Sequence, residues 1–118
     1  MRFLLSYFVL TWNIIFLESK RGEKFVEEFV KSQDAKTIAK VGNEIDLLEK
    51  HGPILGMPHA KKLTSGLYEL RIRGKQEIRI IYSFVKDNIY LLHAFKNRRL
   101  ELHQKKLKLP LQDWNQLN

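Results

Sequence analysis

Hydrophobic residues recur along this chain with two different periods, helical in the first half and strand-like in the second. Residues 12–17 form an apolar, β-branched run that predicts a first strand. Residues 22–31 gather their apolar side chains on one side of a helix. A second helix is expected to begin near Ser32 or Asp34, both suitable N-caps, and to end at His51-Gly52-Pro53. Its apolar stripe comprises Ile38, Val41, Ile45 and Leu48.

The second half of the chain changes to an alternation of apolar and polar side chains, which is the period of a half-buried strand. It follows a loop rich in proline and glycine at residues 53–60. The alternation predicts two strands, at residues 68–73 and 78–84. The almost continuous apolar run at residues 89–95 predicts a third, central strand that is covered on both faces. Short turns join them as two antiparallel hairpins. The order of strand, two helices and three strands predicts an α+β fold with both helices on one face of the sheet.

The whole chain, residues 1–118, is expected to form one small domain. It has no cysteine, which excludes disulfide scaffolds, thiolate zinc sites and cysteine nucleophiles. Residues 1–11 are interpreted as an extension ahead of the first strand, because their apolar run is too short for a membrane span and no cleavage site of small residues follows it. A cytoplasmic protein without a membrane partner is therefore expected.

Charge is distributed unevenly between the two halves. The chain has 21 Lys and Arg residues against 13 Asp and Glu residues, a net charge of +8. Residues 1–60 hold eight basic and eight acidic residues, whereas residues 61–109 hold thirteen basic and four acidic ones. This one-sided surplus favours a polyanionic partner, with nucleic acid ahead of a membrane surface or an acidic protein. A solvated, lysine-rich face is the alternative.

Several common catalytic motifs are missing from the sequence. There is no glycine-rich phosphate loop, no HExxH motif and no carboxylate cluster in the basic half, and the four histidines are too scattered to suggest a metal site. The sequence therefore predicts a mechanism that uses neither a metal nor a small-molecule cofactor.

Basic residues on the predicted strands are the remaining candidates for chemistry. Arg71 and Arg73 share one side of their strand, because side chains two residues apart point the same way. The apolar residues between them are expected to face the helices, so the two arginines should lie on the uncovered face, with Arg79 across the turn. Lys61 and Lys62 precede this hairpin. Further basic groups end the last strand: His93, Lys96, Arg98 and Arg99.

The same residues also admit a structural interpretation. Glu69 and Glu77 are available as ion-pair partners for the strand arginines. His93, between Leu92 and Ala94, can equally be a buried, hydrogen-bonded histidine. From the residues alone, the pattern supports a polyanion-binding α+β domain.

Three spaced segments, at residues 63–73, 78–82 and 90–96, resemble the HigB/RelE-type toxins of bacterial toxin–antitoxin modules, in particular their phage-derived branch. They match the patterns L-x-x-G-L-x-E-L-R, R-x-x-Y and L-L-H-x-F, in that order, and the resemblance covers residues 12–96. It implies the RelE/ParE-like fold, in which an N-terminal strand and two helices accompany a twisted, mostly antiparallel sheet and a variable C-terminal segment. It also implies an mRNA interferase, a metal-independent endoribonuclease that cuts mRNA on the ribosome.

The resemblance implies roles for individual residues. Arg73 matches a strand arginine that contacts the phosphate, Lys62 matches a basic residue that acts as general base or phosphate ligand, and Lys96 suits leaving-group stabilisation. The expected catalytic set is Arg73, Lys62, Lys96, Arg79 and His93. The expected RNA-binding set is Lys61, Arg71, Lys75, Arg98, Arg99 and His59. The implied partners are mRNA, the ribosome and a cognate helix-turn-helix antitoxin.

Residues 97–118 depart from the family's pattern, which continues with a second lysine and the start of a helix. A shifted reading frame beginning near His103 would restore that helix for one choice of codons, and the gene's nucleotide sequence tests this hypothesis. A toxin copy weakened or inactivated at its C-terminus is therefore one alternative. The others are a ParE-like inhibitor of DNA gyrase and an RNA-binding module without catalysis.

Overall fold

The computed structural model of the protein describes residues 11–97. Arg98, Arg99, residues 1–10 of the expected N-terminal extension and residues 98–118 of the atypical C-terminal segment lie outside the described residues. The helical elements are α2 (Phe25–Lys31), α3 (Ala35–His51) and the 3₁₀ turn η1 (Gly52–Ile54). The strands are β1 (Asn13–Phe16), β2 (Ala60–Thr64), β3 (Leu67–Ile72), β4 (Glu77–Val85) and β5 (Asn88–Asn97).

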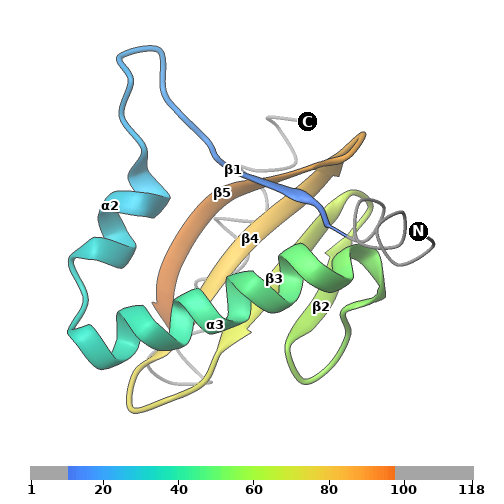
Figure 1. Ribbon diagram of the computed structural model, residues 1–118. Helices are drawn as coiled ribbons and strands as arrows, with labels where there is room; N and C mark the ends of the chain where they lie inside the picture. Colours follow the sequence, from blue (N-terminus) through green and yellow to red (C-terminus); the bar gives the residue numbers. More distant parts are fainter. Residues whose placement is uncertain (1–10, 98–118) are drawn as a thin grey trace, which may run out of the picture.

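The five strands form one mixed sheet in the order β1-β5-β4-β3-β2. β1 runs parallel to β5, and the other neighbouring strands pair antiparallel. Figure 1 shows α2 and α3 on the same side of this sheet. The predicted α+β class is confirmed, and the arrangement is consistent with the RelE-like fold that the resemblance implies. No helix within residues 11–97 is long and apolar enough to cross a membrane.

α3 begins and ends where the sequence predicts. The Asp34 carboxylate accepts a hydrogen bond from the backbone N–H of Thr37 at 2.7 Å, which satisfies one of the free donors at the start of the helix. This bond holds the pKa of Asp34 below its ordinary value. The helix ends at Gly52, which has a φ of +56°. A Cβ there would collide with the Trp12 ring, so glycine lets β1 approach the end of α3.

β2 is the strand that the sequence pattern did not predict. The expected loop ends where Ala60 begins β2, and Lys61 and Lys62 lie within this strand. The register with β3 shifts between Lys62 and Thr64. This irregularity interrupts the two-residue alternation, and a short edge strand carrying two lysines lacks the apolar signal of a central strand.

The hydrophobic core lies between the helices and the facing side of the sheet. Val41 and Leu48 of α3 and Val26 of α2 are almost completely buried there. The sheet contributes the buried residues Ala60, Leu70, Ile72, Ile78, Ile80, Tyr82, Ile89 and Leu91. The opposite side of the sheet, called the outer face below, carries a smaller apolar cluster around Leu67 and Ile81. The rest of the outer face is polar.

Candidate functional site

Strand register arranges the outer-face side chains in rows across the sheet, because directly paired residues share a face. The first row contains Lys61, Glu69, Ile81 and His93. The second row contains Arg71, Arg79 and Phe95. The third row contains Arg73, Glu77 and Asn97. Most of the predicted site residues within the described part of the chain therefore share one surface.

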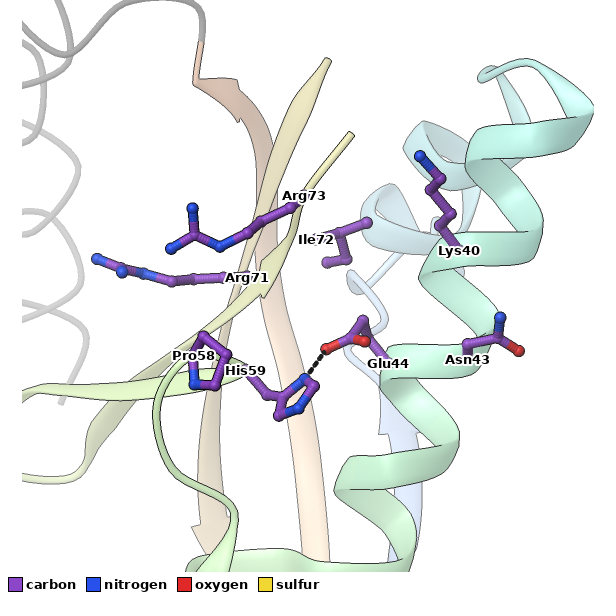
Figure 2. Close-up of a pocket in the computed structure, with 8 residues that line it drawn as sticks. All are labelled: Lys40, Asn43, Glu44, Pro58, His59, Arg71, Ile72 and Arg73. Carbon is purple, nitrogen blue, oxygen red and sulfur yellow. Dashed lines mark hydrogen bonds and ion pairs between the residues drawn. The ribbon is translucent and has the colours of Figure 1, made fainter. Parts of the chain in front are cut away.

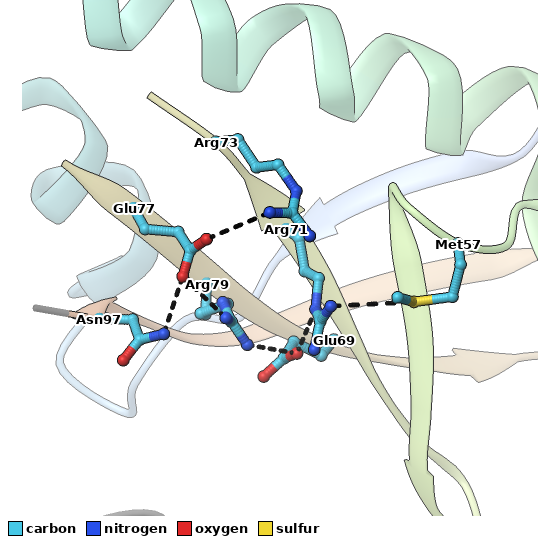
Figure 3. Close-up of polar contacts among 7 residues, drawn as sticks. All are labelled: Met57, Glu69, Arg71, Arg73, Glu77, Arg79 and Asn97. Atoms are coloured by element: carbon cyan, nitrogen blue, oxygen red, sulfur yellow. Dashed lines mark hydrogen bonds and ion pairs between the residues drawn. The ribbon is translucent and has the colours of Figure 1, made fainter. Parts of the chain in front are cut away.

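A chain of ion pairs runs through the middle of this surface (Figure 3). Glu69 accepts hydrogen bonds from Arg71 Nε at 3.0 Å and from Arg79 Nη1 at 2.8 Å. Arg79 also donates through Nη2 to Glu77 at 2.8 Å, and Asn97 donates to the same Glu77 oxygen at 2.8 Å. Arg73 ends the chain, 3.8 Å from the other Glu77 oxygen. Three guanidinium groups and two carboxylates leave this network with a net positive charge.

Arg79 lies in the interior of the network. The residue is 5% exposed and its partner Glu69 only 1%. A buried charge must be paired to avoid a large desolvation cost, and Arg79 is paired on both sides. Arg79 belongs to the expected catalytic set, but its two carboxylate partners favour the structural alternative, in which this arginine is held by Glu69 and Glu77. We assign it a positioning role.

Glu77 is kept ionised by the same contacts. Partial burial opposes its charge, but hydrogen bonds from Arg79 and Asn97 and the nearby charge of Arg73 outweigh that effect and hold the pKa of Glu77 below its ordinary value. The anionic form therefore persists at neutral pH and is lost only in acid.

Arg73 and Lys61 are the cations that this surface presents to solvent. The Arg73 side chain is 59% exposed, and its 3.8 Å contact with Glu77 is looser than the others in the network. Lys61 is exposed on β2 opposite Glu69. Arg71 lies between them and is 15% exposed. Lys75 is exposed in the turn that follows β3. An anion approaching the outer face meets these groups first.

Lys62 and Lys96 do not join this surface. Lys62 is paired with Tyr68 and Lys96 with Ile78, and both partners have their side chains on the helix side of the sheet. The expected catalytic set groups these two lysines with Arg73, but the register places them on the other face of the sheet. The physical reason is the period of a strand: Lys61 and Lys62 are adjacent in sequence and so point to opposite faces.

His93 lies on the outer face across β4 from the arginines. Its ring stacks on Phe95, with ring centroids 5.9 Å apart. Desolvation by the surrounding protein lowers the pKa of His93, although part of the residue stays exposed. The imidazole is therefore neutral at pH 7 and able to accept a proton.

His59 occupies a separate pocket at the edge of the sheet, where β2 has not yet begun (Figure 2). The pocket has a volume of about 290 Å³. It is lined by Lys40, Asn43, Glu44, Pro58, His59, Arg71, Ile72 and Arg73. His59 Nδ1 lies 2.8 Å from Glu44 Oε1 of α3. No group of acidic or histidine residues within residues 11–97 is arranged to hold a metal ion.

The α3 contribution to this pocket was missed by the sequence analysis. Lys40 and Glu44 are four residues apart, the spacing that places two side chains on one stripe of a helix. The sequence shows this spacing, but it does not show that this side of α3 packs opposite the end of β3.

The outer face and the sheet topology together describe an arginine-rich α+β protein of RelE-like form. A model of the family described as "Phage derived protein Gp49-like (DUF891)" matches residues 28–114. This chain therefore belongs to the Gp49-like phage-derived family, a RelE/toxin-like family, and membership implies an antitoxin as partner. The match includes most of the atypical C-terminal segment. No curated protein matches the sequence.

Proposed function

We propose that this protein is the toxin of a type II toxin–antitoxin module, a HigB-like, metal-independent endoribonuclease that cleaves mRNA on the ribosome. One observation carries the proposal: the exposed Arg73 stands beside the buried arginine–glutamate network on the outer face of a chain from a RelE/toxin-like family. The guanidinium group suits this task, because it clamps a phosphate through two parallel hydrogen bonds.

The reaction that fits this surface needs no metal. The ribose 2′-oxygen attacks the adjacent phosphorus, the bond from phosphorus to the 5′-oxygen breaks, and a 2′,3′-cyclic phosphate and a 5′-hydroxyl are formed. A base takes the proton from the 2′-OH, and an acid or water returns one to the leaving oxygen. Negative charge builds on the phosphorane, so fixed cations around the phosphate lower the barrier.

The strand register supplies suitable positions for those cations. Lys61 is diagonal to Arg71 across the β2–β3 pair, and diagonal neighbours lie about 7–8 Å apart. Arg73 is two residues further along the strand, about 6.8 Å from Arg71. A scissile phosphate over Arg71 thus has Lys61 on one side and Arg73 on the other. Glu69 and Arg79 beneath them hold Arg71 in place.

His93 is the general base that we propose for this site. His93 lies two strands away from β3, level with Glu69, and Arg71 is two residues further along β3. The Cα atoms of His93 and Arg71 are therefore about 12 Å apart. The two side chains can extend toward each other over this gap, which leaves room for one nucleotide between them. Its lowered pKa provides the neutral imidazole that proton abstraction requires.

The test uses purified protein in a translation extract that contains a defined mRNA. We expect the wild-type protein to cut the transcript while it is being translated, and Arg73→Ala to leave it intact. The 5′-hydroxyl ends of the products report the mechanism. Intact transcripts with the wild-type protein would contradict the proposal. Inhibition of gyrase supercoiling without RNA cleavage would assign the fold to the ParE-like activity instead.

A further inference from the structure

The pocket between α3 and the end of β3 is built differently from the outer face. Its floor includes the buried Ile72, and Pro58 supplies a second apolar wall. Polar groups from three segments surround these walls: Lys40 and Glu44 on α3, His59 in the loop, and the arginines of β3. Polar groups placed around apolar walls can fix the orientation of a small bound ligand.

His59 and Glu44 form a hydrogen-bonded pair within this pocket. The Glu44 side chain is 19% exposed and the His59 side chain 40%. A carboxylate can only accept hydrogen bonds, so the proton of this bond lies on His59 Nδ1. Nε2 is then left for another partner. Glu44 thus fixes both the tautomer and the orientation of the ring. Figure 2 shows the His59 side chain turned toward Glu44 on α3.

Lys40 is positioned by a glycine at its side of the pocket. A Cβ added at Gly74 would lie 2.8 Å from Lys40 Nζ, so the ammonium group sits against the backbone at this point. A second, smaller hollow of about 120 Å³ adjoins the pocket and shares Lys40 and Ile72 with it. Lys36 and Lys75 line this hollow. The edge of the sheet therefore carries cations that continue from the outer face toward α3.

Arg71 and Arg73 connect the pocket with the outer face. Both line the pocket, yet Figure 2 shows their guanidinium groups extending to the side of β3 away from α3. These groups are placed to hold a phosphate at the edge of the sheet, on the outer face. The two arginines therefore border both the outer face and the pocket.

We propose that this pocket binds a single unstacked RNA base, next to the phosphate held by Arg71 and Arg73, and so selects the sequence at the cleavage site. The inference rests on the proposed function and names a specificity site for it. The volume of about 290 Å³ is at the small end of ligand sites, which suits one base and not a longer segment. Proteins commonly recognise single-stranded RNA by taking up unstacked bases in this way.

The test compares two conservative substitutions on α3, with the four ribonucleoside 3′-monophosphates as probes. Glu44→Gln keeps the size of the side chain but weakens its hold on His59. Asp46→Asn, two residues away and exposed, removes the same charge outside the pocket. We expect the wild-type protein to prefer one of the four nucleotides, and Glu44→Gln to weaken that binding about 10- to 100-fold. Asp46→Asn should bind like the wild type.

Cleavage mapping separates this inference from the proposed function. If the wild-type protein cleaves mRNA, Glu44→Gln is expected to broaden the base preference beside the cut while cleavage continues. Equal nucleotide binding by Glu44→Gln and Asp46→Asn, or cleavage with an unchanged base preference, would overturn the pocket assignment and leave the nuclease intact. Selective nucleotide binding without any mRNA cleavage would overturn the nuclease and support the pocket. Lys40→Gln provides a second pocket variant if Glu44→Gln does not fold.

Discussion

The two faces of the sheet bury different kinds of side chain. On the helix side, Ile78 and Ile80 are fully buried among aliphatic neighbours. On the outer face, the intervening Arg79 is almost as buried, yet it is held by two carboxylates. The helix side therefore gains stability from apolar burial alone, whereas the outer face holds charged groups in fixed positions. We interpret the first as the structural face and the second as the catalytic face.

The largest effect is expected from breaking the buried network. Arg79→Ala leaves Glu69 buried without its best partner, and the loss of one member of a buried pair costs about 3–5 kcal/mol. Urea denaturation should show this as a lower midpoint. The double variant Arg79→Leu with Glu69→Leu removes both charges and should recover much of the loss. A single variant as stable as the wild type would show that the network does not hold the outer face together.

Arg73→Ala should separate activity from stability. The exposed side chain has one loose ion pair, so the free energy of unfolding should change by no more than about 0.5 kcal/mol. Loss of a group that stabilises the phosphorane should slow mRNA cleavage about 10²- to 10³-fold. Single-turnover cleavage and thermal melting measure the two effects on the same sample. Equal cleavage rates for variant and wild type would place the phosphate elsewhere.

The pH dependence of cleavage tests His93. Its pKa is lowered, so the neutral base form is complete above that pKa and is lost as the pH falls through it. The cleavage rate should therefore stay level near pH 7 and fall about tenfold per pH unit in the acid range. His93→Gln should be slow throughout and lack this acid limb. An acid limb that persists in His93→Gln would assign the titration to another group.

A conservative change on the helix side should have the opposite effect to Arg73→Ala, lowering stability without changing activity. Ile80→Val removes one methylene from the core and should cost about 0.5–1.5 kcal/mol in the free energy of unfolding. The cleavage rate per folded molecule should stay the same, since Ile80 points away from the outer face. Denaturant titration and cleavage at a temperature below the transition measure both. A lower rate in the folded variant would show that the two faces are coupled.

Local patterns predicted the elements well where each element carries its own signal. α3 was defined by its apolar stripe and by the Asp34 cap, and the alternation in β3 correctly assigned Arg71 and Leu70 to opposite faces. Features that depend on how one strand pairs with another could not be predicted from local patterns. β2 lacks an apolar pattern, so the face of each of its lysines followed only from its register with β3.

The candidate site also combines a residue that a local pattern predicted with a contact that no local pattern predicted. The exposed Arg73 was predicted from the motif and the strand period, and its role stays a prediction. The contact between Glu44 and His59 joins residues fifteen positions apart and depends on how α3 crosses the end of β3. No local pattern contains that information, because it arises from tertiary packing.

The two adjacent lysines of β2 test the assignment of the catalytic face most directly. Lys61→Ala and Lys62→Ala remove the same charge from neighbouring exposed positions, but the register places Lys61 on the outer face and Lys62 on the helix side. The initial rate of mRNA cleavage should fall about tenfold or more for Lys61→Ala and stay near the wild-type value for Lys62→Ala. A loss of activity in Lys62→Ala with full activity in Lys61→Ala would contradict this assignment.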